Sequence, residues 1–259
     1  MSVARLLEPI TGRTDTVTLA DAEDWLQGRT LYGGASALIA YTQAIRAFPD
    51  LPPLRAAQIG FVAPVGEQVE LHAEIVRQGR NVAQVRSEIR CDGQIALTAF
   101  LLFGVARQAN ALFPGAPPED FPPPPEQSDS AMSDKGPGFI RKNFELRRAQ
   151  DFSGPGAPVV RRWARLTSAE GLDPISSLVL MGDVLPPGAM RAMRRQGPIS
   201  SINWSFNLLD TAPATRDGWW LLENASQHAD EGYSSERLRL WNTEGKQVLD
   251  GLQSVAIFG

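Results

Sequence analysis

The chain has 259 residues, which is enough for one large or two modest domains. Its hydrophobic fraction of 43% is typical of a globular protein. Its net charge of −4 argues against a general nucleic-acid-binding protein, because no overall positive field attracts phosphates. A single cysteine excludes an internal disulfide and a cysteine-based metal cluster, and two histidines argue against a multi-histidine metal site. We find no secretory signal and no apolar run long enough to cross a bilayer, so we expect a cytoplasmic protein.

The first part of the chain predicts two helices followed by four antiparallel strands. Thr18 is a suitable N-cap for a short helix that reaches Trp25. Gly33 and Gly34 permit a tight turn into a second helix over 35–48, whose apolar spacing indicates burial. Alternating apolar residues then predict strands over 58–62, 69–76, 82–89 and 95–105.

Residues 108–140 predict an extended linker, because proline at this density blocks both helix formation and sheet pairing. Beyond it, the pattern predicts a helical region over 173–181 that continues into 188–193. Strands are expected over 144–148, 159–166, 199–208, 219–228, 233–241 and 246–258. We therefore expect one unit at 1–107 and a second at 141–259.

The second unit repeats the pattern of the first at an offset of 152 residues. At this offset Gly93 aligns with Gly245, and each glycine belongs to a tight turn between two alternating runs. Leu101 aligns with Gln253, so an amide stands in one copy where the other copy has an apolar side chain. The repeat predicts a duplicated α+β fold, each copy an antiparallel sheet around a central helix, with a single specialised site.

Six segments, taken in order, carry a family resemblance. They are the Gly-Gly helix start at 31–34, the Pro-Val-Gly at 64–66, the Arg-Gln-Gly-Arg-Asn turn at 77–81, and the stretches 181–186, 217–222 and 250–253. Together they resemble the double hotdog acyl-CoA thioesterases of the TesB-like, thioesterase II type. This resemblance implies a double hotdog fold, an acyl-CoA substrate, no cofactor, and assembly into a homodimer or homotetramer.

In that family an Asp, a Thr or Ser, and a Gln hold and activate the water that attacks the thioester. The resemblance assigns two of these roles to Asp183 and Gln253. Counting back from Gln253 without gaps places Gln227 where the hydroxyl residue usually stands, with Ser226 and His228 beside it. Gln227 is thus a departure from the family pattern at the third catalytic position.

Thioester hydrolysis explains why these residue types are suitable. The reaction needs a positioned water, a group that accepts its proton, and a donor for the oxyanion. Asp183 can accept the proton or orient the water, and Gln253 can hold the water through its amide oxygen. A backbone N–H at a helix start, at Gly34, at Ala35 or near Asp183, can meet the oxyanion. The competing interpretations are a helix cap for Asp183 and a solvent-facing position for Gln253.

Two other functions compete with hydrolysis. A hotdog enoyl-CoA hydratase or dehydratase usually uses an Asp–His dyad near a helix start. His72 and His228 lie in predicted strands, far from Asp183 in the sequence, which disfavours this reading. A non-catalytic acyl-thioester-binding protein would keep the pocket without a competent water site, and Gln227 at the hydroxyl position favours that alternative.

Several arginines are candidates for contacts with the phosphates of coenzyme A. They are Arg77, Arg80, Arg86 and Arg90 in the first unit, and Arg191, Arg194 and Arg195 in the second. The competing interpretation, which we favour, is an ordinary solvated charged surface, because isolated basic side chains usually face water.

Overall fold

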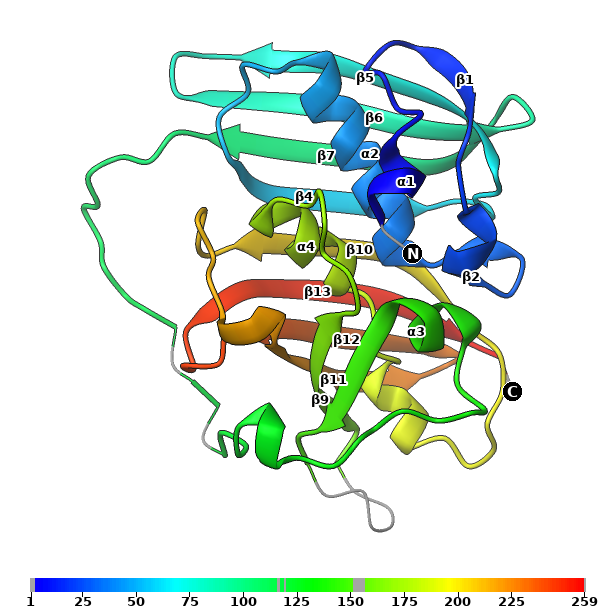
Figure 1. Ribbon diagram of the computed structural model, residues 1–259, viewed down its shortest axis with the longest axis vertical. Coiled ribbons are helices and arrows are strands. Elements are labelled where there is room, and N and C mark those ends of the chain that lie inside the picture. Colours follow the sequence, from blue (N-terminus) through cyan, green and yellow to red (C-terminus); the bar gives the residue numbers. More distant parts are fainter. Residues whose placement is uncertain (1–2, 116, 119, 151–156, 259) are drawn as a thin grey trace.

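The computed structural model describes residues 3–115, 117–118, 120–150 and 157–258. Its centre is one sheet of eleven strands, whose order is β1 (Asp15–Thr18), β5 (Gln68–Gln78), β6 (Val82–Cys91), β7 (Gln94–Gly104), β4 (Leu54–Phe61), β10 (Ile199–Leu208), β13 (Gln247–Ile257), β12 (Tyr233–Trp241), β11 (Trp220–Asp230), β9 (Val159–Leu166) and β8 (Phe144–Arg148). The two halves of this sheet meet where β4 pairs antiparallel with β10. Each half carries its own helix, α2 (Gly33–Ala47) in the N-terminal half and α4 (Pro174–Met181) in the C-terminal half (Figure 1). The structure is therefore a double hotdog in which the two units share one sheet.

The N-terminal half contributes five strands to this sheet and contains the long helix α2. The strands are β1 (Asp15–Thr18), β4 (Leu54–Phe61), β5 (Gln68–Gln78), β6 (Val82–Cys91) and β7 (Gln94–Gly104), and the smaller elements are α1 (Val3–Leu7), η1 (Ala22–Trp25), β2 (Leu26–Gln27) and β3 (Thr30–Leu31). Helix α2 spans Gly33–Ala47 and is buried along most of its length against β5, β6 and β7. The expected buried helix and the four strands after it are confirmed.

The C-terminal half repeats this arrangement with six strands. Its elements are α3 (Gly138–Asn143), β8 (Phe144–Arg148), β9 (Val159–Leu166), α4 (Pro174–Met181), η3 (Gly188–Arg191), β10 (Ile199–Leu208), η4 (Arg216–Gly218), β11 (Trp220–Asp230), β12 (Tyr233–Trp241) and β13 (Gln247–Ile257). Helix α4 begins where the Asp173 side chain accepts hydrogen bonds from two backbone amides, with proline at the first helical position.

The internal repeat is visible in the strand order. Strand β7 lies next to β4, and β13 lies next to β10, so the last strand of each half flanks the central pair. Gly93 and Gly245 both have positive φ angles, of 75° and 82°, as tight hairpin turns require. Leu101 is 1% exposed and Gln253 is 3% exposed, so both copies bury this position. The amide of Gln253 therefore lies inside the fold, where it needs a polar partner.

One expected element is wrong. The helix from Thr18 to Trp25 does not form, because Thr18 is the last residue of β1 and pairs with Gln68 of β5. Only the short 3₁₀ turn η1 is helical in this stretch. Asp21 has a φ of 56°, a left-handed conformation that an α-helix does not accommodate.

The proline-rich segment is packed on the sheet along part of its length. It leaves β7 and runs along one side of the molecule toward the C-terminal half (Figure 1). The Phe121 ring meets the Trp163 ring edge-on, and Trp163 Nε1 donates a 2.9 Å hydrogen bond to the carbonyl of Pro123. The turn η2 (Pro125–Gln127) and the start of α3 also lie within 108–140, and neither was expected. Both halves belong to one sheet, so the sheet itself marks no boundary between two domains. The division of the chain at 107 and 141 stays a prediction.

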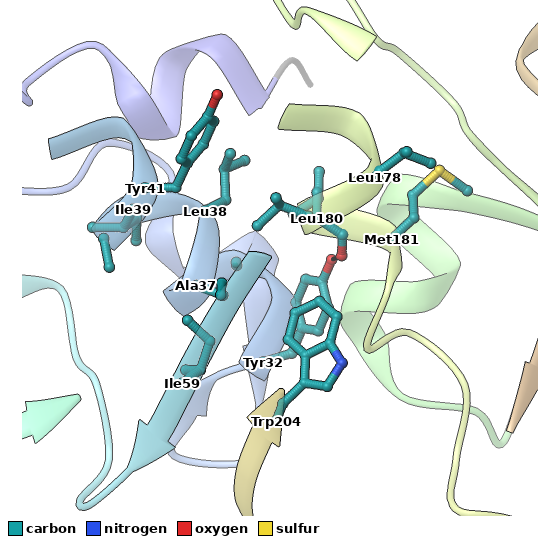
Figure 2. Close-up of a cluster of buried hydrophobic side chains, with 14 of the residues drawn as sticks. Tyr32, Ala37, Leu38, Ile39, Tyr41, Ile59, Leu178, Leu180, Met181 and Trp204 are labelled. Atoms are coloured by element: carbon teal, nitrogen blue, oxygen red, sulfur yellow. Dashed lines mark hydrogen bonds between the residues drawn. The ribbon is translucent and has the colours of Figure 1, made fainter. Parts of the chain in front are cut away.

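The hydrophobic core is continuous across the β4–β10 seam. One cluster of buried side chains includes Leu38 of α2, Ile59 of β4, Leu180 of α4 and Trp204 of β10. Figure 2 shows these four residues around the place where α2 and α4 come together. A site at this seam is therefore formed by both halves of the chain. Within the described ranges, no helix is both long and apolar enough to span a bilayer.

Candidate active site

Asp183 and Gln253 meet at the end of α4. Asp183 follows the last residue of α4 by two positions, and Gln253 lies on β13. Gln253 Nε2 donates a 2.6 Å hydrogen bond to Asp183 Oδ1. On β13, Gly251, Gln253 and Val255 are buried while Leu252 is 57% exposed, so the amide faces inward. The structure thus brings the expected carboxylate and amide together, and the interpretation of Gln253 as a solvent-facing residue is wrong.

The start of α2, from the other half of the chain, completes the surroundings of this pair. The Gly34 backbone amide donates a hydrogen bond to the Asp183 carboxylate. An added Cβ atom at Gly33 would lie 2.1 Å from Asp183 Oδ2, so only glycine lets the carboxylate approach this closely. The unpaired amides and the dipole of a helix N-terminus favour a carboxylate in this position.

The environment of Asp183 changes its acidity. The residue as a whole is partly buried, but its carboxyl group is removed from solvent. Burial raises the pKa of Asp183 to about 7, against the opposing effect of the hydrogen bonds from Gln253 and Gly34, which lower it. A carboxyl group with a pKa near neutrality is well matched to general base catalysis.

Tyr32 connects the two helices at the site. Its hydroxyl donates a hydrogen bond to the carbonyl of Leu180 in the last turn of α4 (Figure 2). Its ring stacks on Phe139, with ring centroids 4.4 Å apart. Burial, together with the nearby charge of Asp183, raises the pKa of Tyr32 well above its usual value, so the hydroxyl stays protonated and keeps donating. Tyr32 therefore fixes the start of α2 against the segment that leads to Asp183.

The structure does not bring Gln227 to this pair. Gln227 is exposed at a bulge in β11, and its Nε2 donates to the carbonyl of Ala225 on the same strand. Strand β12 separates β11 from β13, so Gln227 is two strands away from Gln253. His228 is exposed, and the Ser226 hydroxyl contacts the Ser234 hydroxyl at 2.9 Å. The structure therefore does not support Gln227 as the third group, because the strands directly beside β13 are β10 and β12.

Strand β10 carries a hydroxyl at a more suitable place. Ser201 is the register partner of Val255, which lies two residues from Gln253 on the same face of β13. A bulge after Ser201 shifts the register and leaves Ile202 exposed. Ser201 therefore fits the position of the family's Thr or Ser better than Gln227 does.

Glu236 is a buried carboxylate that the sequence reasoning missed. It is 0% exposed and is the register partner of Gln253 on β12. Its carboxylate accepts hydrogen bonds from the amides of Gly188, at 2.8 Å, and Ala189, at 3.3 Å. Glu236 thereby anchors the start of η3, which follows Asp183 in the chain. The signal was present in the sequence, because Glu236 alternates with two leucines on the face that proves to be buried.

The backbone amides at the start of α2, which were expected to donate to an oxyanion, already have acceptors within the protein. The Gly34 amide donates to Asp183. The amides of Ala35 and Ser36 both donate to the carbonyl of Tyr32, at 3.0 Å and 3.1 Å. The start of α2 therefore positions the carboxylate, and the expectation that Gly34 or Ala35 meets an oxyanion has no support from this geometry.

The candidate arginines do not form one cluster. Arg77, Arg80, Arg194 and Arg195 are exposed, Arg86 and Arg90 form ion pairs with Glu88, and Arg191 donates to the carbonyl of Val159. The exposed arginines fit the interpretation of a solvated charged face, whereas Arg86 and Arg90 pair with the buried carboxylate of Glu88. Among the described residues, no group of His, Cys, Asp and Glu side chains could hold a metal ion.

Comparison with known protein families identifies the chain. The sequence model of the acyl-CoA thioesterase N-terminal domain matches residues 21–104, and that of the acyl-CoA thioesterase C-terminal domain matches residues 117–257. The chain belongs to the acyl-CoA thioesterase family. Helix α2 lies within the N-terminal match, and Asp183 and Gln253 lie within the C-terminal match. No curated protein matches the chain.

Several solved structures share the fold of this chain. A conserved hot dog protein of unknown function from Alicyclobacillus acidocaldarius superimposes with a TM-score of 0.82 at 18% identity, covering 94% of this chain and 92% of that chain. The tesB protein of Mycobacterium avium subs. paratuberculosis gives 0.73 at 21% identity, covering 88% of each chain. The acyl-CoA thioesterase II TesB2 of Mycobacterium marinum gives 0.70 at 18% identity, covering 86% and 88%. Dehydratase domains also match, with lower TM-scores of 0.51 to 0.57.

Proposed function

We propose that the chain hydrolyses acyl-CoA thioesters to a free acid and coenzyme A at the Asp183–Gln253 pair. The observation that carries this proposal is the part-buried 2.6 Å hydrogen bond between these side chains at the junction of the two halves. Gln253 uses its NH₂ group on the carboxylate, which leaves its carbonyl oxygen to accept a hydrogen bond from water. The arrangement supports a water molecule held between a proton acceptor and an amide oxygen.

The proposed reaction needs no covalent intermediate. The water oxygen attacks the thioester carbon while Asp183 accepts a proton from the water, and the carbonyl electron pair moves to oxygen. The tetrahedral intermediate then collapses, the carbon–sulfur bond breaks, and the leaving thiolate takes up the proton from Asp183. Ser201 is the proposed hydroxyl group that helps to hold the water, since its backbone pairs next to the position of Gln253.

The position of the histidines disfavours a hydratase or dehydratase. His228 is exposed on β11, and His72 contacts the Thr14 hydroxyl at 3.0 Å near the edge of the other half. Neither histidine forms a dyad with Asp183, whose partners are Gln253 and Gly34. Association into a homodimer or homotetramer stays a prediction from the family resemblance.

The test is thiol release from a panel of saturated acyl-CoAs of increasing chain length, measured with a thiol-reactive chromogen. We expect release by the wild-type chain and a loss of kcat of about 100-fold or more in Asp183→Asn, because the proton acceptor is removed. Asp250→Asn is the matched control, since Asp250 lies on the same strand but pairs with Arg237 at the partly exposed face.

The other outcomes separate the competing functions. Tight binding of acyl-CoA with no turnover at any chain length would identify a binding protein. Hydration of an enoyl-CoA without thiol release would identify a hydratase.

A further inference from the structure

Trp204 lies beside the catalytic pair with its ring fully buried. It is 0% exposed and sits on β10, where it is the register partner of Gln253 on one side and of Ile59 on the other. Paired residues on adjacent strands have Cα atoms about 4.5–5.5 Å apart. Figure 2 shows the indole with its nitrogen on the side away from Ile59.

Two glycines make room for this indole. An added Cβ atom at Gly182, which precedes Asp183, would lie 2.5 Å from Trp204 Cζ2. An added Cβ atom at Gly251, two residues before Gln253, would lie 3.2 Å from Trp204 Nε1. The nitrogen edge of the indole is thus held between the segments that carry the two members of the pair.

The indole N–H of Trp204 has no hydrogen-bond partner among the described residues. Leaving a buried donor unsatisfied costs about 1–3 kcal/mol, so such a group calls for an explanation. The indole N–H of Trp163, by contrast, donates to the carbonyl of Pro123, and the nearby Tyr32 hydroxyl donates to the carbonyl of Leu180. Trp204 therefore presents an unused donor, whereas the donors of Trp163 and Tyr32 are both in use.

The reaction at this site needs such a donor. Negative charge develops on the thioester oxygen when water attacks, and fixed hydrogen-bond donors stabilise it most effectively in a site that excludes water. The amides of Gly34 and Ala35, which were expected to supply this contact, donate to Asp183 and to the carbonyl of Tyr32. The indole N–H of Trp204 is a buried donor beside the Asp183–Gln253 pair, and the described residues supply no acceptor for it.

We propose that Trp204 is a catalytic residue whose indole N–H donates a hydrogen bond to the thioester oxygen of the bound acyl group. This inference rests on the proposed thioesterase function. In the attack step the new carbon–oxygen bond forms, the carbonyl electron pair moves to the thioester oxygen, and that oxygen accepts the hydrogen bond. Trp204 neither gains nor loses a proton, and its hydrogen bond strengthens as the charge develops.

Trp204→Phe tests the proposal, because it removes the donor and keeps an aromatic ring. We expect kcat for acyl-CoA hydrolysis to fall about 100- to 1,000-fold, as for removal of other oxyanion donors, with a much smaller change in KM. Trp163→Phe is the control, since its indole donates elsewhere, and it is expected to keep the wild-type kcat. Replacement of Trp204 by 3-benzothienylalanine, which has sulfur in place of N–H at nearly the same shape, serves as the second variant where Phe disturbs folding.

A spectroscopic measurement separates this role from packing. Asp183→Asn is expected to bind acyl-CoA without cleaving it, so the carbon-13 carbonyl stretch of the bound thioester can be recorded by infrared spectroscopy. We expect a lower frequency in Asp183→Asn than in the double variant that also carries Trp204→Phe. Equal frequencies, or a kcat of the benzothienylalanine variant equal to that of the wild type, would overturn the role of Trp204. Absence of thiol release by the wild-type chain would instead overturn the thioesterase function itself.

Discussion

At the scale of single residues, two opposing effects set the pKa of the Asp183 carboxyl group. Removal from water raises its pKa, and the hydrogen bonds from Gln253 and Gly34 lower it, with a balance at about 7. A carboxyl group with an ordinary pKa would be ionised throughout the neutral range but would be a weaker base. The buried amide of Gln253 therefore holds the carboxylate in place and also moderates its pKa.

The pKa of Asp183 predicts the pH dependence of the reaction. Below about pH 7 the carboxyl group is protonated and cannot accept a proton, so kcat/KM should rise with pH and reach half its maximum near pH 7. Gln253→Met removes a hydrogen bond that lowers this pKa, so the midpoint should move to higher pH. A kcat/KM profile measured from pH 5 to 9 checks both statements.

The control for this measurement is Gln247→Met. Gln247 lies at the start of the same strand and donates to the carbonyl of Leu249, so its replacement should leave the midpoint unchanged. A flat profile for the wild-type chain over the same range would show that Asp183 is not the titrating base.

At the scale of elements, the site depends on how closely the start of α2 approaches the end of α4. The N-cap residue Tyr32 bonds to Leu180, and an added Cβ atom at Gly34 would lie 2.2 Å from the same carbonyl oxygen. The Gly33–Gly34 pair thus permits a helix–helix contact that also brings an amide to Asp183. The two glycines serve close approach, and their φ angles are not in the left-handed region.

Gly33→Ala should disable the site without unfolding the chain. The new methyl group would lie 2.1 Å from Asp183 Oδ2 and 2.9 Å from the Phe61 ring, so the carboxylate must move. A displacement of about 1 Å at a catalytic group costs about 100-fold in rate, and we expect a loss of kcat of that order. Gly66→Ala is the matched control, because its Cβ atom would meet no atom within 4 Å. Thiol-release kinetics and circular dichroism of both variants check this, and a fully active Gly33→Ala would contradict the geometry.

At the scale of the whole molecule, the two halves share one continuous sheet and one hydrophobic core. The sheet continues through the β4–β10 pair, and α3 of the C-terminal half packs on η1 of the N-terminal half. Asn143 is 2% exposed, and its Nδ2 donates to the carbonyls of Asp24, at 2.8 Å, and Phe139, at 3.1 Å. A buried amide thus bridges the two halves at a second place, away from the central strands.

Asn143→Ala should destabilise the entire chain in a single transition. The change leaves a buried carbonyl of Asp24 without its donor, which should lower the free energy of unfolding by about 1–3 kcal/mol. Urea unfolding followed by far-ultraviolet and near-ultraviolet circular dichroism measures this, and both signals should share one midpoint. Asn110→Ala is the control, since Asn110 is exposed in the segment after β7. Two separate transitions, of which Asn143→Ala shifts only one, would show that the halves unfold independently.

The sequence by itself determined the local elements and the duplication. Apolar alternation located the strands, the Gly93 and Gly245 turns located two hairpins, and the Leu101–Gln253 alignment identified a buried amide in one copy. These signals are readable because burial of one strand face imposes a period of two on neighbouring residues. The helix expected from Thr18 failed because the pairing of β1 with β5 overrode a local capping signal.

Only the tertiary structure decided which residues surround the catalytic pair. Gln253 and Asp183 are 70 residues apart, and Tyr32 is 148 residues from Leu180, so no local pattern records their contact. The periodicity of strands does not reveal their order in a sheet, so the sequence could not show that β13 lies between β10 and β12, with the Gln227 strand β11 one position farther away. Which donors and acceptors face one another is set by the packing of distant segments, and local sequence carries no information about that packing.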